Sequence, residues 1–241
     1  MRTDRIRLSI FFPCHNEQAN VEPLVRKALA VLPTISDDYE VIIVNDGSTD
    51  GTGAVADRLA AEIPRVRAVH HEKNKGYGGA LQSGFRAATK DYVFYTDGDG
   101  QFDLGELPDL VPLVEQADIV TCYRLNRTES FVRRFNGHAW TWLVNRLFKL
   151  HLRDIDCAFK LYKREIFDKI EMHSTGALID TEILARAHNA GYSMIQKGVR
   201  HYPRTAGQSS GASIKVILRA FKELFQLRRQ IMKSKKLKAK S

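Results

Sequence analysis

The segment YVFYTDGDGQFD, residues 92–103, joins a short apolar run to a group of carboxylates. Val93–Tyr95 have the composition of a buried β-strand. Directly after them come Asp97, Asp99 and Asp103, separated by glycine and glutamine. Charge at the end of a buried strand is typical of the carboxyl edge of a parallel sheet, where α/β proteins bind their ligands. The segment therefore predicts both the fold class and the position of a site.

The first half of the chain alternates apolar runs with segments of helical periodicity. The apolar runs cover residues 7–13, 40–46, 66–71, 92–97 and 118–124. Apolar residues recur at helical spacing in residues 17–32, 51–63, 78–89 and 104–116. This alternation predicts a mostly parallel sheet with helices on both faces. In the less regular second half, helices are expected over residues 130–150, 177–191 and 212–232, and a strand over residues 192–202.

The composition limits the class of protein and of partner. The chain has 241 residues and a formal net charge of +9, which favours an anionic partner. No apolar run is long enough for a transmembrane helix, and the N-terminal run lacks the features of a signal peptide. Cys14, Cys122 and Cys157 match no zinc-binding spacing, so a reducing, cytoplasmic setting is expected. Most of the excess positive charge lies after residue 214, without an aromatic-interleaved nucleic-acid-binding motif, which argues against nucleic acid as the partner.

Polar residues follow the other early strands as well. The run at residues 7–13 leads into His15, Asn16 and Glu17, and the run at residues 40–46 ends in Asp46. Because the carboxyl ends of parallel strands share one edge of a sheet, these side chains are expected to gather beside the 97–99 segment.

Each of these groups has a functional and a structural interpretation. Asp97 and Asp99 can share a divalent cation, and oxygen ligands suit Mg²⁺ or Mn²⁺ bound together with phosphate; the alternative is an ordinary Asp/Gly turn. Asp46 can accept hydrogen bonds from a nucleobase or ribose, or can merely precede a helix cap. Lys75 and the glycines after it are typical of a phosphate-binding helix start, although the ending of a Walker motif is missing.

Seven motifs in order now point to a family: PCHNE, VNDGSTDGT, NKGYGGAL, TDGDGQFD, DIDCAFKLYKRE, DTEILARA and PRTAGQSSG. Over roughly Leu8 to Gly211, the chain resembles the inverting family 2 glycosyltransferases, which have the Rossmann-like GT-A fold. Within them it is most similar to the transferases that use dolichyl or polyprenyl phosphate. The resemblance implies a catalytic domain over residues 1–211, followed at residues 212–241 by a basic amphipathic helix and tail.

The resemblance also implies roles for individual residues. The nucleotide-sugar donor, linked to UDP or GDP, would contact Pro13, Asn16, Glu17, Asp46, Lys75, Gly76, Asp97, Gly98, Asp99, Arg204 and Ser209. Asp97, Asp99 and Gln101 would hold Mg²⁺ or Mn²⁺, with Asp99 as the main ligand. Arg204 begins the family's R-x-x-G-x-S loop, which closes over the diphosphate, and Ser210 stands where the family often has Lys. Asp103 is expected to cap the helix that begins near Leu104.

The acceptor decides whether the reaction needs a general base. A polyprenyl phosphate is already ionised when it attacks the sugar from the opposite face, whereas a hydroxyl of a saccharide or lipid-linked saccharide must lose a proton. Asp156, Asp180 and Glu182 are candidate bases, and each of them can instead be structural. Arg204 completes the set of candidate catalytic residues.

Basic residues suggest where the acceptor lies. Arg124, Arg127, Arg133 and Arg134 can hold an acceptor phosphate or form a solvated basic face. The helix after residue 212 has an apolar stripe, made of Ile214, Ile217, Leu218, Phe221, Leu224, Phe225 and Ile231 and flanked by lysine and arginine. We expect this helix, with Trp140 and Trp142, to lie on an anionic membrane surface at the cytoplasmic face. Alternatively, the stripe packs on the protein itself or on a second subunit of a homo-oligomer.

A nucleotide-binding protein without transfer activity is the competing interpretation from another functional class. It would require a damaged cation site, and the DGDGQ sequence is intact.

Overall fold

A seven-stranded sheet forms the centre of the protein in a computed structural model that describes residues 5–125, 131–204 and 214–238. In space the strands lie in the order β3-β2-β1-β4-β6-β5-β7. Their bounds are Leu8–Cys14 (β1), Tyr39–Asn45 (β2), Val66–His70 (β3), Tyr92–Thr96 (β4), Ile119–Arg124 (β5), Phe159–Lys163 (β6) and Met194–Val199 (β7). The predicted α/β class with a mostly parallel sheet is confirmed.

Strand β6 is the exception to the parallel order. It lies between β4 and β5 and runs antiparallel to both, with Phe159 opposite Thr96. The beginning of β6 therefore lies at the edge where the parallel strands end. This arrangement brings residues that precede β6 in the sequence, such as Asp156, to the same edge as Asp97.

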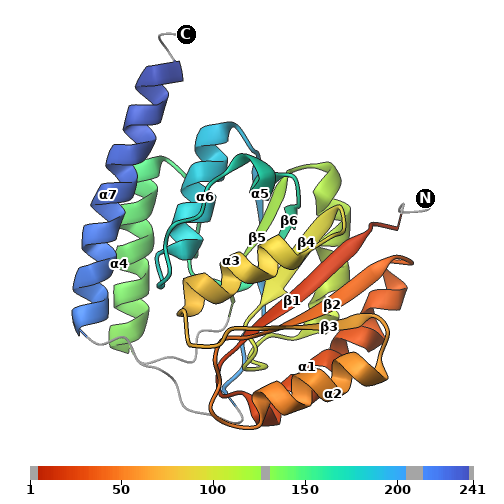
Figure 1. The fold of residues 1–241 in the computed structure, drawn as a ribbon. Coiled ribbons are helices and arrows are strands. Elements are labelled where there is room, and N and C mark those ends of the chain that lie inside the picture. Colours follow the sequence, from red (N-terminus) through yellow and green to blue (C-terminus); the bar gives the residue numbers. More distant parts are fainter. Residues whose placement is uncertain (1–4, 126–130, 205–213, 239–241) are drawn as a thin grey trace.

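Helices cover both faces of the sheet (Figure 1). They are α1 (Gln18–Val31), α2 (Thr52–Glu62), α3 (Tyr77–Ala87), α4 (Phe131–Phe148), α5 (Ile166–Lys169), α6 (Ile179–Ala190) and α7 (Ile214–Lys238), with a 3₁₀ turn η1 (Leu32–Thr34). α1 and α2 pack together on one face, and α3 contacts α6 on the other. Helical periodicity in the sequence thus correctly predicted that helices cover both faces of the sheet.

The predicted helix over residues 104–116 is wrong. The segment forms two 3₁₀ helices, η2 (Leu104–Asp109) and η3 (Val111–Glu115). Pro108 and Pro112 explain the difference, because proline lacks an N–H donor and disfavours the α conformation of the residue before it. The expected cap is confirmed, since the Asp103 side chain accepts a hydrogen bond from the backbone of Gly105.

The core beneath the site is aromatic. The Phe11 and Tyr95 rings stack with centroids 5.5 Å apart, and Phe85 of α3 meets both rings edge-on. Tyr162 of β6 extends this cluster toward Phe167. These contacts anchor β1, β4, β6 and α3 to one another, so the loops at their ends start from a rigid base.

Helices α4 and α7 lie side by side next to α6 (Figure 1). Trp140 of α4 meets Phe221 of α7 edge-on, with ring centroids 5.5 Å apart. Leu224, Leu227 and Ile231 of α7 are buried. Part of the apolar stripe of α7 therefore packs on the protein, as the alternative interpretation expected. Within the described ranges, no helix is both long enough and apolar enough to cross a membrane.

Candidate active site

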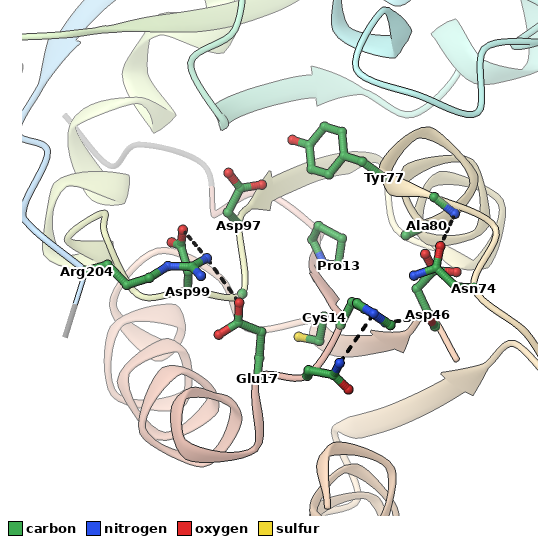
Figure 2. A pocket seen from close by; sticks show the side chains of 14 residues that line it. Pro13, Cys14, Glu17, Asp46, Asn74, Tyr77, Ala80, Asp97, Asp99 and Arg204 are labelled. Atoms are coloured by element: carbon green, nitrogen blue, oxygen red, sulfur yellow. Dashed lines mark hydrogen bonds and ion pairs between the residues drawn. The ribbon is translucent and has the colours of Figure 1, made fainter. Parts of the chain in front are cut away.

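A cavity of about 820 Å³ opens at the carboxyl ends of β1, β2 and β4. It is lined by Pro13, Cys14, His15, Asn16, Glu17, Asp46, Asn74, Gly76, Tyr77, Ala80, Asp97, Gly98, Asp99 and Arg204. Figure 2 shows Asp46 and Asn74 at one end of this cavity and Glu17, Asp99 and Arg204 at the other. The polar residues predicted to gather at one edge of the sheet are thus brought together.

The acidic end of the cavity contains Glu17, Asp97 and Asp99. One Arg204 nitrogen donates to Glu17 Oε1 at 3.1 Å and to Asp99 Oδ2 at 3.0 Å. Gly98 allows the loop after β4 to approach β1 closely, because a Cβ atom there would lie 2.8 Å from the Pro13 carbonyl oxygen. The close approach of the two strand ends therefore places the carboxylates of both in one cavity.

The Asp97 carboxylate has an unmet hydrogen-bonding capacity. Its Oδ1 is buried without a hydrogen-bond partner among the described residues. Burial, followed by the charge of Asp99, raises the pKa of Asp97 to about 7, although Tyr77 opposes this shift. Burial likewise raises the pKa of Glu17, against the opposing effects of Asn20 and Arg204. A cation beside Asp97 and Asp99 would satisfy the free oxygen and offset the repulsion between the carboxylates.

The described residues alone do not complete a metal centre. The described residues contain no group of three or more His, Cys, Asp or Glu side chains arranged to hold a metal ion. This fits Mg²⁺ or Mn²⁺, which commonly bind one or two carboxylates together with substrate phosphates.

Gln101 joins the acidic end of the cavity to the segment that carries Arg204. Its side-chain amide donates to the Tyr202 carbonyl at 2.9 Å, and the Tyr202 amide donates to the Gln101 carbonyl at 2.8 Å. The Gln101 backbone amide also donates to Asp99 Oδ1 at 3.1 Å. Gln101 thus fastens the segment before Arg204 to the loop of Asp99, and its predicted role as a metal ligand stays a prediction.

The other end of the cavity is built around Asp46. This residue is buried, and its Oδ1 accepts hydrogen bonds from His71 Nδ1 at 2.6 Å and from the Lys75 backbone amide at 2.8 Å. The Asp46 carbonyl accepts from His15 Nδ1 at 2.9 Å. Asn16, in a left-handed conformation, accepts from the Thr49 amide at 2.8 Å, so it also has a structural task.

Sequence reasoning missed His71. The signal was present, because His71 directly follows β3, Asp46 directly follows β2, and the two strands are neighbours.

The start of α3 differs from the predicted phosphate cradle. The Gly78 amide donates to the Thr175 carbonyl at 3.0 Å, and a Cβ at Gly78 would lie 2.3 Å from the Ser174 carbonyl oxygen. The absence of a side chain at Gly78 therefore allows the loop before α6 to pack against the start of α3. Gly76 lines the cavity, whereas the exposed Lys75 is not among the described residues that do.

Comparison with known proteins gives the family. The model of the family described as Glycosyl transferase family 2 matches residues 9–171. The chain belongs to glycosyl transferase family 2.

Relatives of this family 2 chain include the glycosyltransferase AglD of Haloferax volcanii, with 34% identity over 83% of the chain and 34% of the relative. The undecaprenyl-phosphate 4-deoxy-4-formamido-L-arabinose transferase of Aeromonas hydrophila is 31% identical over 86% of the chain and 63% of the relative. The chain thus spans about a third to two thirds of the length of these curated relatives.

Among solved structures, glucosyl-3-phosphoglycerate synthase of Mycobacterium tuberculosis, in complex with Mn²⁺, UDP and phosphoglyceric acid, has the same fold. The TM-score is 0.66 at 20% identity, over 94% of this chain and 76% of that one.

Two of the three candidate bases in this family 2 chain are buried in structural pairs. Asp180 accepts a hydrogen bond from Lys160 Nζ at 2.6 Å and another from the Tyr95 hydroxyl. Glu182 Oε2 accepts from the backbone amides of His173, at 2.9 Å, and Ser174, at 2.7 Å. These contacts disfavour a role in which either carboxylate reaches an acceptor.

Asp156 is the exposed member of the three candidate bases, in the turn just before β6. Protein atoms nevertheless surround its carboxyl closely enough that desolvation, followed by the charges of Asp180 and Asp154, raises its pKa to about 7. Of the three acids, Asp156 alone combines access to solvent with a pKa suited to taking up a proton near neutral pH.

Of the four arginines predicted to hold the acceptor phosphate, the structure describes the side chain of Arg124 alone. Arg124 donates to Asp154 through Nε at 2.7 Å and through Nη2 at 2.9 Å, so its charge is largely neutralised within the protein. Arg127 and Ser209 lie outside the described residues, and Arg133 and Arg134 lie in α4 with side chains outside the described part. Their predicted contacts with the acceptor phosphate and the donor stay predictions.

Proposed function

We propose that the chain catalyses an inverting, divalent-metal-dependent transfer of a sugar from a UDP- or GDP-linked donor to a dolichyl or polyprenyl phosphate. One observation carries this proposal. A single cavity in a family 2 domain joins the buried carboxylate of Asp46 to the acidic cluster of Glu17, Asp97 and Asp99 with Arg204. A relative whose alignment covers most of the chain is named for undecaprenyl phosphate, and this supports a lipid phosphate as the acceptor of this chain.

The acidic end of the cavity suits the departing nucleoside diphosphate. Asp97 and Asp99, with Gln101, would hold Mg²⁺ or Mn²⁺. When bound, this ion stabilises the negative charge that develops on the diphosphate. Arg204 would contact the diphosphate beside this ion, since its guanidinium already lies within hydrogen-bond distance of Asp99. The fold neighbour that binds UDP with Mn²⁺ supports the use of such an ion.

A phosphate acceptor fits the state of the candidate bases. It is ionised at neutral pH and needs no proton removed, so the burial of Asp180 and Glu182 is no obstacle to the reaction. A second function, transfer to a saccharide hydroxyl, is favoured by one observation: the exposed Asp156 has a pKa raised to about 7. Asp156 would then be the general base.

The acceptor would be reached at a membrane surface. On α4 and α7, Trp142 is 67% exposed, Phe225 48% and Met232 50%. Lys222, Arg229 and Lys233 of α7 are exposed as well. Exposed apolar side chains among basic ones are typical of helices that lie on anionic lipid. We therefore propose peripheral contact with the cytoplasmic face, with association into a homo-oligomer as the competing use of this surface.

The test is radiolabel transfer from a panel of UDP- and GDP-sugars to polyprenyl phosphate or to a saccharide, with Mg²⁺, Mn²⁺ or chelator. We expect transfer to polyprenyl phosphate that is lost with chelator and in Asp99→Ala, but retained in Glu115→Ala, an exposed acid outside the cavity. Transfer that survives both chelator and Asp99→Ala would refute the metal assignment. Transfer to the saccharide alone, abolished by Asp156→Asn, would establish the second function instead.

A further inference from the structure

The two oxygens of the Asp46 carboxylate have different surroundings. Oδ1 accepts from His71 Nδ1 at 2.6 Å and from the Lys75 backbone amide at 2.8 Å. Among the described residues, every hydrogen bond to this carboxylate goes to Oδ1. Because Asp46 lines the cavity, Oδ2 is the oxygen left for a ligand. The base end of the cavity therefore offers one carboxylate acceptor rather than two.

The His71 ring is held at both nitrogens. Nδ1 meets Asp46, and Nε2 lies 2.8 Å from the Ser83 hydroxyl of α3. The His71 side chain is only 3% exposed. Since the carboxylate can only accept, Nδ1 carries the proton of this bond. His71, itself anchored to Ser83 of α3, thus holds the Asp46 carboxylate in one orientation.

We propose that His71 is a positioning residue that makes this cavity selective for uracil as the donor base. This inference rests on the proposed use of a nucleotide-sugar. Uracil has one ring N–H, flanked by carbonyl oxygens, and this donor matches the single free oxygen of Asp46.

Guanine and cytosine fit the same oxygen less well. The ring N–H and the exocyclic amine of guanine point the same way and match a carboxylate that offers both oxygens, but Oδ1 is already occupied. Cytosine presents an unprotonated ring nitrogen, whose lone pair would face Oδ2. A site built for one hydrogen-bonding pattern rejects a ligand that leaves a buried polar group unpaired.

Calorimetric binding of UDP, CDP and GDP in the presence of Mn²⁺ tests the inference on the wild-type chain. We expect UDP to bind at least about tenfold more tightly than CDP or GDP, as one unpaired buried group would cause. GDP binding as tight as UDP binding would overturn the inference while leaving the proposed function intact. Failure of all three nucleotides to bind would instead contradict the proposed function.

Asp46→Asn provides a sharper test, because it should invert the preference. The Lys75 backbone amide can only donate, so the asparagine must turn its oxygen toward Lys75 and present its NH₂ group to the base. That group repels the uracil N–H and pairs with the cytosine ring nitrogen. We expect CDP to bind more tightly than UDP. An equal loss of affinity for all three nucleotides would show that Asp46 acts through its charge alone, and would overturn the inference.

Variants of the two neighbouring histidines separate positioning from folding. His71→Ala should reduce the ratio of UDP to CDP affinity at least about threefold, because the carboxylate loses one of the two donors that orient it. His71→Asn should restore the ratio, since its amide can donate from nearly the place of Nδ1. His70→Ala is the matched control, because His70 pairs with Asn45 and Asp57 and leaves Asp46 untouched. A His70→Ala change as large as that of His71→Ala would refute the positioning role; if His71→Ala does not fold, Asp46→Asn decides.

Discussion

The buried ion pair between Lys160 and Asp180 allows a quantitative test of whether Asp180 is structural or catalytic. Lys160 of β6 is fully buried, and its ammonium donates to Asp180 at 2.6 Å and to the Tyr95 hydroxyl at 3.1 Å. Burial acts to lower the pKa of Lys160, but the charge and hydrogen bond of Asp180 outweigh it and raise the pKa. Lys160 is therefore charged, and Asp180→Asn leaves a buried ammonium without a counter-charge.

Removal of one partner from such a pair is costly. Losing the counter-charge of a buried ion pair costs about 3–5 kcal/mol of the free energy of unfolding. For a chain of this size each kcal/mol lowers the melting temperature by about 2–4 °C, so we expect Asp180→Asn to melt roughly 6–20 °C below wild type. The double variant Asp180→Asn with Lys160→Met should regain most of this loss, because no unpaired charge remains.

Thermal and urea unfolding would measure both variants, with Arg26→Ala as the control. Arg26 forms an exposed ion pair with Glu22, and we expect its removal to leave the melting temperature within error of wild type. Sugar transfer per folded Asp180→Asn molecule, measured below its melting temperature, should remain close to wild type. A melting temperature close to wild type together with a large loss of turnover would refute the structural interpretation and restore Asp180 as a candidate base.

Three further predictions address the metal, the loop and the membrane. Asp97, with a pKa raised to about 7, is protonated below that pH, and the proposed metal ligation requires its ionised form. Mn²⁺ affinity in the presence of UDP should therefore fall up to about tenfold per pH unit below 7, and Asp97→Asn should flatten this profile. Gln101→Leu removes the hydrogen bond to Tyr202 and should weaken UDP binding up to about tenfold; a loss of Mn²⁺ affinity larger than the loss of UDP affinity would support the metal-ligand role instead. Phe225→Glu, at an exposed position of α7, should weaken binding to anionic vesicles without lowering the melting temperature, and unchanged vesicle binding would count against the membrane surface.

The sequence was informative wherever one local rule governed the structure. Apolar runs and helical periodicity predicted the layers, and the polar residues after the strands predicted the cavity, because chain connectivity places the ends of parallel strands together. The cap at Asp103 followed from local hydrogen bonding. In residues 104–116 the apolar spacing predicts an α-helix, but the two prolines lack N–H donors and the segment forms 3₁₀ helices instead.

Pairings between distant segments could not be predicted in the same way. The antiparallel insertion of β6 depends on how two distant parts of the chain meet. The loop before α6 covers the start of α3 through backbone carbonyls, which carry no sequence signal. His71 belongs to the same class, since its role appears only once β3 is placed beside β2.

The candidate bases show why residue type alone does not assign chemistry. Asp156 and Asp180 have the same side chain, and both lie in motifs that resemble those of the family. Tertiary contacts distinguish them: Lys160 neutralises Asp180 in the core, whereas Asp156 is exposed with a raised pKa. If the acceptor is a phosphate, neither carboxylate has a proton to remove, and Asp156→Asn should leave turnover nearly unchanged between pH 6 and 8. If the acceptor is a hydroxyl, the same substitution should abolish transfer, and wild-type turnover should rise with pH through about 7 as Asp156 loses its proton. One variant measured across this pH range therefore distinguishes the two proposed acceptors.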